Sequence, residues 1–290
     1  MTVYRVTHRT EYSYSARVSS SFGEAVMAPR PLPVQECLST RLDIEPAPHG
    51  LRERTDYFGN RTSWFSVLTP HSRLAVTATS VVRVRGQRLP EGPTGPWERA
   101  GELARLDTSA VEFLLESPQV APTPALAEYA AASFPPGRDA LAAARDLCSR
   151  IHRDFAYTPG ATEVSTAITE VLERRAGVCQ DFAHVAIGCL RAVGLAARYV
   201  SGYLETEPPP GRPRLEGADA THAWVSVLLP AGWVDLDPTN DQPADDRYVT
   251  TAWGRDYTDV APLKGVIFSQ GRTHDLAVAV DVVRVPDPAA

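Results

Sequence analysis

The sequence of 290 residues is poor in the features that mark several specialised classes of protein. Its four cysteines have no paired spacing, which argues against a disulfide framework or a zinc ribbon. No run approaches the ~20 apolar residues that a membrane span needs. Residues 1–8 alternate in polarity and lack the apolar stretch of a signal peptide. A cytoplasmic protein without a membrane partner is therefore expected.

Concentrated positive charge is also absent. The net charge is −6 and the arginines are scattered, whereas a nucleic-acid-binding face needs a basic patch. No nucleic-acid partner and no cofactor are expected. The hydrophobic content of 43% is sufficient for a folded core, and the length allows one large or two modest domains.

Short alternating segments at the start of the chain predict an antiparallel β-sandwich over residues 1–86. A stretch rich in glycine and proline predicts a linker over residues 87–107. Helical patterns followed by strand patterns then predict one α+β domain over residues 108–290. The expected strands of the sandwich are Tyr4–Tyr14, Ser20–Met27, Cys37–Glu45, Arg54–Tyr57, Thr62–Leu68 and Leu74–Arg85.

The α+β domain contains several segments with a 3.6-residue apolar spacing. Helices are expected at residues 111–115, 126–134, 139–155 and 167–175, the last with Thr166 as its N-cap. The alternating tail Leu276–Val282 predicts a further antiparallel strand. Pro208–Pro213 predicts an exposed loop beside the site described next.

Cys179 lies where a loop becomes a helix. Gly177 permits a sharp turn into that helix, and Gly194 is a stop signal after it. In a first helical turn, free backbone N–H groups and the helix dipole lower the pKa of a thiol and favour the nucleophilic thiolate. The alternative is a small buried hydrophobe, which suits Cys148 and Cys189 better. The apolar stripe of the helix is Phe182, Val185, Ala186, Cys189, Leu190 and Val193.

Two consecutive strand patterns follow the helix. In the first, His222 and Ser226 share one face; in the second, Trp233, Asp235 and Asp237 share one face. A hairpin that pairs Ser226 with Trp233 also pairs His222 with Asp237. Their Cβ atoms would lie ~5 Å apart, so the carboxylate of Asp237 would orient the imidazole. Asp235, a diagonal neighbour of His222, is the alternative partner.

These segments carry a family resemblance. Gly177–Asp181, Thr221–Val225 and Trp233–Asn240 resemble, in this order, the core motifs of the transglutaminase-like superfamily of papain-fold cysteine enzymes. Three further segments resemble sequences of the bacterial branch of this superfamily, whose members are commonly labelled as cysteine proteases. They are Phe155–Tyr157, Ala197–Tyr203 and Gly254–Tyr257. The first part of the chain resembles the β-rich N-terminal domain that precedes the core in that branch.

The resemblance implies a papain-like (transglutaminase-like) core with a Cys-His-Asp triad. Cys179 is implied to be the nucleophile, His222 the general base and acid, and Asp237, rather than Asp235, the orienting carboxylate. The backbone N–H of Cys179 is expected to be one donor to the oxyanion. A second donor is expected from Tyr157, from Gln180 or from a backbone group, and we favour Tyr157 because it matches a family position.

Other residues are candidates for supporting or substrate-contacting roles, each against an alternative of ordinary packing. Asp181, one helical turn from His184, and Asp235 are candidates for support of the site. Trp224, Tyr203, Arg255 and Tyr257 are candidates for substrate contact, as pocket walls or as part of a lid. His152 and Cys148 have a spacing compatible with metal binding, but no further ligands lie nearby in the sequence, so no metal site is expected.

The expected reaction is acyl transfer. Cys179 would attack a carboxamide or peptide carbonyl in a peptide or protein substrate, and a second nucleophile would resolve the thioester. We favour hydrolysis of a peptide or isopeptide bond because water is always available. The alternatives are transfer to an amine, a non-catalytic papain-fold binding module and a metal-binding protein. The sandwich could also mediate formation of a homo-oligomer.

Overall fold

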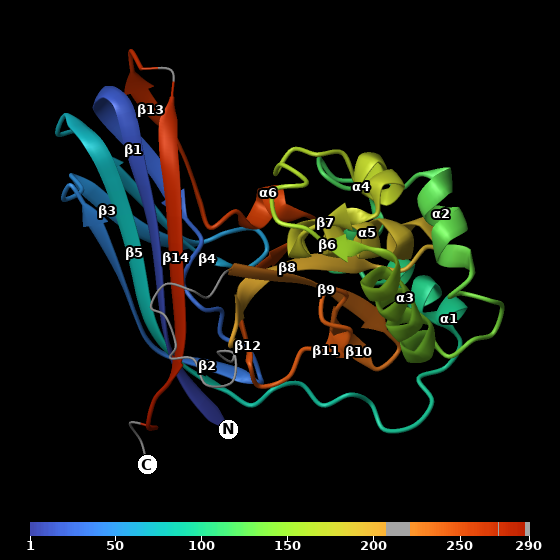
Figure 1. The fold of residues 1–290 in the computed structure, drawn as a ribbon. Coiled ribbons are helices and arrows are strands. Elements are labelled where there is room, and N and C mark those ends of the chain that lie inside the picture. The colour runs from blue at the N-terminus through green and yellow to red at the C-terminus, as the bar shows by residue number, and fades with distance from the viewer. Residues whose placement is uncertain (207–220, 272, 288–290) are drawn as a thin grey trace, which may run out of the picture.

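The computed structural model describes residues 1–206, 221–271 and 273–287. An antiparallel β-sandwich stands beside an α+β part in which helices pack against a second sheet (Figure 1). The first and the last described strands, Thr2–Ala25 and His274–Arg284, both lie in the sandwich (Figure 1). The expected sandwich and the α+β class are therefore confirmed. The loop predicted at Pro208–Pro213 lies outside the described residues.

One long strand is shared by both layers of the sandwich. The first half of β1 pairs with β5 and β14, and its second half pairs with β4 and β13. β2 extends the sheet beside β5, and β3 extends it beside β4. The strands are β1 (Thr2–Ala25), β2 (Gln35–Glu45), β3 (Gly50–Thr55), β4 (Arg61–Val67), β5 (His71–Val84), β13 (Leu263–Ser269) and β14 (His274–Arg284).

The sheet folds over where β1 changes layer. The ladder between β1 and β5 shifts register between Ser13 and Val18, at the bend. Residues 15–17 contain no glycine or proline, so β1 continues through the bend as one strand where two were expected. The two halves enclose a core cluster of Ala25, Met27, Ile44, Phe65, Val67, Leu74, Val76 and Ala78.

The last two strands correct the expected domain boundary. β13 and β14 follow the α+β part in the chain, yet both pair with β1. Tyr4 stands opposite Arg284, so the two ends of the chain are neighbours in one ladder. An alternating pattern identifies a strand but does not say which sheet accepts it. The boundary 108–290 is thus wrong at its C-terminal end, because Leu263–Ser269 and His274–Arg284 belong to the sandwich.

The predicted linker over residues 87–107 also needs correction. It contains the helix α1 (Trp97–Leu106), whose small residues are buried. A Cβ at Gly101 would lie 2.8 Å from the carbonyl oxygen of Gly194, so only glycine allows this approach. α1 therefore packs as part of the α+β body.

The second sheet has the strand order β11-β10-β9-β8-β12. Its strands are β8 (Ala197–Leu204), β9 (Thr221–Leu229), β10 (Gly232–Asp237), β11 (Gln242–Pro243) and β12 (Tyr248–Gly254). The helices are η1 (Val111–Leu114), α2 (Pro124–Ala131), α3 (Ala140–Asp154), α4 (Ile168–Arg174), α5 (Cys179–Ala192) and α6 (Tyr257–Val260), and β6 (Ala156–Tyr157) and β7 (Ala176–Gly177) form a short parallel pair.

One predicted helix end is confirmed, at Gly194, and one is wrong, at Thr166. Asp139 caps α3 by accepting a hydrogen bond from the backbone N–H of Ala142 (3.1 Å). Gly194, with φ of 84°, follows α5. The cap predicted for α4 is wrong, because Ala167 holds the N-cap position and the Thr166 hydroxyl accepts a hydrogen bond from the backbone of Glu163 instead.

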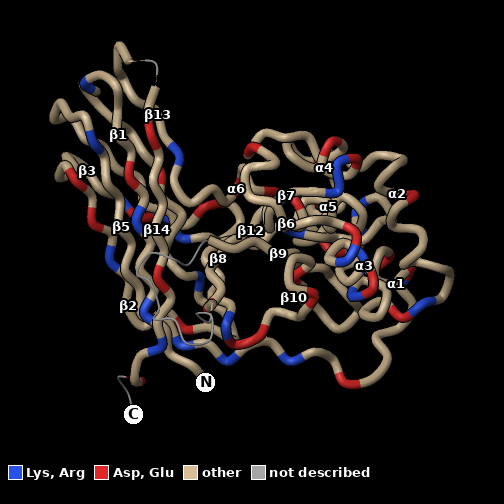
Figure 2. Tube along the Cα trace, in the orientation of Figure 1, with Lys and Arg blue, Asp and Glu red and all other residues tan. Residues whose placement is uncertain are grey.

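The sandwich packs directly on the second sheet. Tyr4, Val82 and Val280 form one apolar cluster with Tyr203 of β8 and Val249 of β12. Basic and acidic residues alternate along the chain in both parts, as Figure 2 shows for the described residues. Within these residues no helix is both long and apolar enough to cross a membrane.

His8 is a buried polar residue at this contact. It is 2% exposed, and its Nδ1 lies 3.0 Å from the hydroxyl of Tyr203. Its Nε2 lies 3.2 Å from the hydroxyl of Thr10. Burial lowers the pKa of His8 to about 4, which keeps the imidazole neutral at neutral pH.

We expect acid to destabilise the fold through His8. The unfolded histidine titrates near 6.5, so between pH 6.5 and about 4 the unfolded chain binds a proton that the folded chain does not. The free energy of unfolding should therefore decrease as the pH falls through this window, by on the order of 2 kcal/mol. Urea denaturation of the wild type and of His8→Gln at neutral and acidic pH measures this loss, which should be smaller in the variant.

The exposed His49 provides the matched control. His49→Gln should keep the pH dependence of the wild type. An acid-induced loss that is equally large in His8→Gln would contradict this interpretation.

Candidate active site

The start of α5 depends on a close contact behind Cys179. A Cβ on Gly177 would lie 2.5 Å from the carboxylate of Asp181, so this position needs glycine. That carboxylate accepts hydrogen bonds from the backbone N–H of Val178 (2.8 Å) and from the hydroxyl of Thr162 (2.6 Å). Asp181 thus caps the helix that carries the thiol. Cys179 itself is the first residue of α5, and its side chain is half-exposed.

The hairpin of β9 and β10 brings His222 to Asp237 in a register that differs from the expected one. Ser226 stands opposite Asp235, not opposite Trp233, which is a displacement of two residues. The expected register leaves no residues for the turn, whereas the structure has a two-residue turn between the strands. An even displacement keeps every side chain on its face. Nε2 of His222 therefore lies 2.7 Å from Oδ2 of Asp237.

The carboxylate of Asp237 is completely buried and accepts several hydrogen bonds. Oδ2 accepts from Nε2 of His222, the hydroxyl of Tyr248 and the side-chain amide of Asn240, each at 2.7 Å. Oδ1 accepts from the backbone N–H of Thr239 at 2.8 Å. Burial alone would raise the pKa of Asp237, but the hydrogen bonds, that from His222 first, hold it below its usual value.

His222 lies between this carboxylate and the thiol. Its Nε2 bonds Asp237, which leaves Nδ1 as the ring nitrogen for Cys179. Burial by itself lowers the pKa of His222, but hydrogen bonds to Asp237 and to Cys179, together with their charges, raise it to about 10. The ring is therefore an imidazolium at neutral pH. A cation beside a thiol favours the thiolate.

Two predicted substrate contacts are corrected by their burial. Trp224 is fully buried, and its ring stacks behind His222 with centroids 6.1 Å apart. Its indole N–H donates to Asp235 (3.2 Å), whereas His222 bonds Asp237. Tyr203 is 2% exposed and contacts His8 between the two parts. A substrate in solution does not reach either aromatic ring.

The two candidates for the second oxyanion donor lie differently. Tyr157 stands opposite Gly177 in the pair of β6 and β7 and is 55% exposed. Burial, and then the charge of Cys179, raise the pKa of Tyr157. Its partner Gly177 is two residues before Cys179 in the chain. The side-chain amide of Gln180 instead donates to the carbonyl of Val164 (3.3 Å). This bond directs Gln180 toward the loop before α4.

The last two candidates form part of α6 and its start. The guanidinium of Arg255 makes two hydrogen bonds of 2.9 Å with the carboxylate of Asp259. The backbone N–H of Tyr257 donates to Nε2 of His184 (3.2 Å), and burial lowers the pKa of His184 to about 4. His184 therefore holds α6 and does not pair with Asp181.

Sequence reasoning missed Tyr248 and Asn240. Asn240 comes three residues after Asp237, within a motif already identified, so its short distance in the chain was a usable signal. Tyr248 lies on β12, a strand that was not expected and that pairs with β8. No local pattern connects Tyr248 to Asp237, because the sheet order brings them together.

The part of the chain that the structure describes contains no group of three His, Cys, Asp or Glu side chains that could hold a metal ion. Cys148 is buried, and Nδ1 of His152 donates to the carbonyl of Thr239 (2.8 Å).

Two family models match the chain. The model of the bacterial transglutaminase-like N-terminal region matches residues 4–83, and the model of the transglutaminase-like superfamily matches residues 128–238. The second match includes Cys179, His222 and Asp237. The tail strands that complete the sandwich lie outside both matches.

Comparisons with individual proteins extend over most of the chain. An uncharacterized protein of Mycobacterium tuberculosis is 48% identical in an alignment 289 residues long, and the match covers 97% of this chain and 92% of that protein. A crystal structure of a "putative cysteine protease" from Cytophaga hutchinsonii has a TM-score of 0.71 at 19% identity and covers 96% of this chain and 90% of its own, which supports the fold. A protein-glutamine gamma-glutamyltransferase of Pseudomonas aeruginosa is 38% identical over 92 residues, 30% of this chain and 14% of that protein.

We expect Tyr248→Phe to destabilise the protein while keeping its fold. The substitution preserves the ring but removes a donor from the buried carboxylate of Asp237, and such charge-assisted hydrogen bonds are worth about 2 kcal/mol. Urea denaturation at neutral pH should show this decrease in the free energy of unfolding. Tyr57→Phe, at a position that is 82% exposed, is the control and should change stability little. Equal effects of the two substitutions would contradict the role given to Tyr248.

Proposed function

We infer the reaction from a premise that the comparisons establish: the chain belongs to the transglutaminase-like superfamily. Superfamily membership supports thiol-dependent catalysis in general. We propose that this protein catalyses acyl transfer at a peptide, isopeptide or glutamine carboxamide bond through a thioester on Cys179. The single observation that carries the proposal is the contact of His222 with Asp237 on one side and with Cys179 on the other.

The charge state of this arrangement suits nucleophilic attack. His222 has a pKa of about 10, so it is protonated at neutral pH and faces the thiol as a cation. Asp237 is buried, and its pKa is held low, so it stays anionic and stabilises the imidazolium. A thiolate and an imidazolium oriented by a carboxylate are the reacting pair of cysteine acyl-transfer enzymes.

In the proposed reaction His222 gives one proton to the leaving group and later takes one from the incoming nucleophile. The thiolate of Cys179 donates its electron pair to the carbonyl carbon, and the C–N bond breaks as the leaving nitrogen takes the proton from Nδ1 of His222. A thioester and a neutral imidazole remain. The imidazole then accepts a proton from the incoming water or amine, whose attack releases the acyl group and restores the starting pair.

The developing oxyanion needs donors near Cys179. Its own backbone N–H is free of an intrahelical partner because Cys179 is the first residue of α5. Tyr157 is the second donor that we propose, since it stands opposite Gly177, two residues before Cys179, and is 55% exposed. One such donor is commonly worth ~3 kcal/mol in the transition state.

Hydrolysis is the outcome that we favour, with a peptide or protein as the acyl donor. Transfer to an amine uses the same residues and is the alternative outcome. The local similarity to the Pseudomonas aeruginosa glutamyltransferase supports this alternative. Exclusion of water from the thioester would separate the two reactions. A non-catalytic papain-fold binding module is the remaining alternative.

The charge of His222 leads to a prediction about thiol reactivity. Cys179 should react with iodoacetamide well below pH 8, because the imidazolium favours the thiolate. His222→Ala should lose this reactivity at neutral pH. Mass spectrometry after labelling across a pH series measures each cysteine separately. Cys37 is an internal control, since it is half-exposed and burial raises the pKa of its thiol. Equal rates for Cys179 and Cys37 at neutral pH would contradict the proposal.

A second prediction concerns the covalent intermediate. After incubation with β-casein and acid quench, mass spectrometry should find an acyl group on the peptide that contains Cys179, and none in Cys179→Ala. Adding dansylcadaverine separates the outcomes, because transfer labels casein, whereas hydrolysis yields new termini or deamidated glutamine. If the wild type forms neither adduct nor product with casein or with a cell extract, the catalytic proposal fails and the binding module is favoured.

A further inference from the structure

The turn that follows β10 wraps around the carboxylate of Asp237. The backbone N–H of Thr239 donates to Oδ1 at 2.8 Å, and the side-chain amide of Asn240 donates to Oδ2 at 2.7 Å. The nitrogen of the same amide lies 3.5 Å from Nε2 of His222. The position of this turn, at residues 239–241, therefore decides whether the carboxylate keeps two of its hydrogen bonds.

The helix α3 holds this turn from the opposite side. The hydroxyl of Ser149 donates to the carboxylate of Asp241 at 2.5 Å, and Nδ1 of His152 donates to the backbone carbonyl of Thr239 at 2.8 Å. Ser149 and His152 are three residues apart, so they stand on one face of the helix. The residues that they bond lie directly before and directly after Asn240. The two bonds thus fix the segment that carries the amide.

The turn has a conformation that needs support. Asp241 has a φ of 52°, in the left-handed region that residues other than glycine rarely adopt. Both Asn240 and Asp241 are exposed, so no apolar packing holds their side chains. The strand that follows, β11, consists of two residues only. A backbone conformation of this kind persists when surrounding contacts hold it, and α3 supplies two of them.

α3 is a rigid support because it is anchored in the core. Cys148 and Ile151 are buried in the apolar cluster that also contains the buried residues of α5. After the end of α3 the chain enters β6, in which Tyr157 stands opposite Gly177 of β7. One helix therefore packs against the helix that carries the thiol and also bonds the turn beside Asp237.

We propose that Ser149 and His152 are positioning residues of the reaction, which hold the turn at residues 239–241 closed over Asp237 and so keep His222 oriented and charged. The inference rests on the proposed function. With the turn in place Asp237 is completely buried, and its charge acts on the imidazolium without screening by water. A displaced turn would admit water to the carboxylate and weaken this attraction. Neither positioning residue takes part in the chemical steps.

The test measures the alkylation of Cys179 by iodoacetamide across a pH series, in the wild type, Ser149→Ala and His152→Ala. A weaker attraction between Asp237 and the imidazolium disfavours the thiolate. The midpoint of the rate profile should therefore move to higher pH in both variants, by on the order of half a unit. Arg145→Ala is the matched control, because Arg145 is exposed on α3 one turn before Ser149. It should keep the midpoint of the wild type.

Two substitutions of Asp241 separate the hydrogen bond from the charge. Asp241→Asn removes the charge but keeps an oxygen that accepts from Ser149, and asparagine tolerates the left-handed conformation. Asp241→Ala loses the acceptor and disfavours that conformation. We expect the alanine variant to shift the midpoint as Ser149→Ala does, and the asparagine variant to restore it. Equal shifts in the two variants would assign the effect to the charge and overturn the positioning role.

A double-mutant cycle tests whether the support acts through Asn240. Asn240→Ala alone should move the midpoint to higher pH, because Asp237 loses the same hydrogen bond. Adding His152→Ala should then move it by less than the two single shifts combined, because the two residues act on one segment. Single shifts that simply add would show independent effects and contradict the route through the turn.

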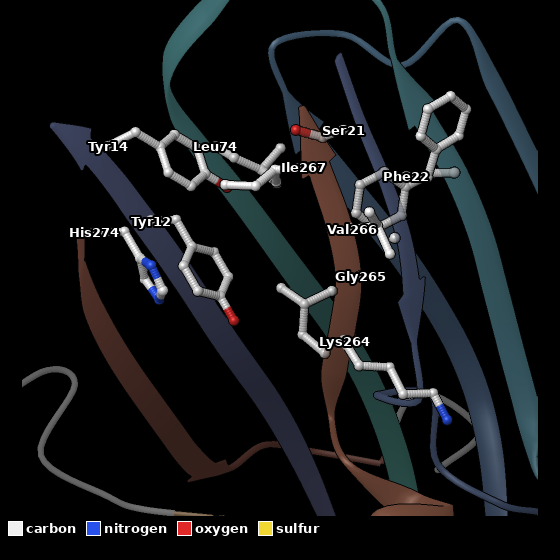
Figure 3. A pocket seen from close by; sticks show the side chains of 13 residues that line it. Tyr12, Tyr14, Ser21, Phe22, Leu74, Lys264, Gly265, Val266, Ile267 and His274 are labelled. Atoms are coloured by element: carbon white, nitrogen blue, oxygen red, sulfur yellow. The ribbon is translucent and has the colours of Figure 1, made fainter. Parts of the chain in front are cut away.

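A variant in the sandwich controls for a general loss of stability. Figure 3 shows a groove there, whose lining residues all belong to the strands and strand ends of the sandwich. Ile267 lines this groove from β13, so Ile267→Ala removes apolar contacts without altering α3 or the turn. Urea denaturation should show a lower free energy of unfolding for this variant. The midpoint for Cys179 should nevertheless stay that of the wild type.

The outcomes separate the positioning role from the reaction. If Cys179 of the wild type reacts no faster than Cys37 at neutral pH, the catalytic proposal fails and the positioning role fails with it. If Cys179 is reactive but Ser149→Ala and His152→Ala match Arg145→Ala, only the positioning role is overturned. A shift in Ile267→Ala as large as in the α3 variants also overturns it, since the midpoint would then follow stability.

Discussion

The buried charge of Asp237 constrains the whole α+β part. A carboxylate without water is tolerated only when its oxygens accept enough hydrogen bonds. Here the donors come from β9, from β12 and from the segment that follows β10, so the sheet order and the hairpin register must both be correct before the charge is satisfied. The same bonds orient His222 toward Cys179. Stability of the sheet and geometry of the candidate site thus depend on one group.

Much of this arrangement was predictable from the sequence. The period of the apolar residues shows which side chains share one face of a helix or strand. The helix that begins at Cys179 and the shared face of His222 and Asp237 follow from spacing alone. The predicted register was displaced by two residues, and it still identified the right pair because strand faces repeat every second residue. Tyr248 was not predictable in this way. It reaches Asp237 through the pairing of β12 with β8, a contact between segments that no local pattern relates.

The type of a residue predicted its role in the site less well than its position in a strand or helix did. Trp224 and Tyr203 were candidates for substrate contact, each against an alternative of ordinary packing. The structure buries both, one behind His222 and one between the sandwich and the second sheet. Gln180 was a candidate oxyanion donor because its side chain is polar. Its amide instead donates to a carbonyl of the loop before α4. The sandwich buries Tyr203, whereas Val200, Ala244 and Tyr248 of the α+β part bury Trp224.

The pairing of both chain ends with each other gives the molecule a particular topology. The α+β part is inserted between β5 and β13, and the ladder from Tyr4 to Arg284 closes the sandwich around that insertion. Contacts between such distant residues form late, because the intervening chain must be ordered first. During synthesis β1 therefore lacks its partner on one side until the last strand emerges. The α+β part can complete its own core earlier, which makes the sandwich the final element to close.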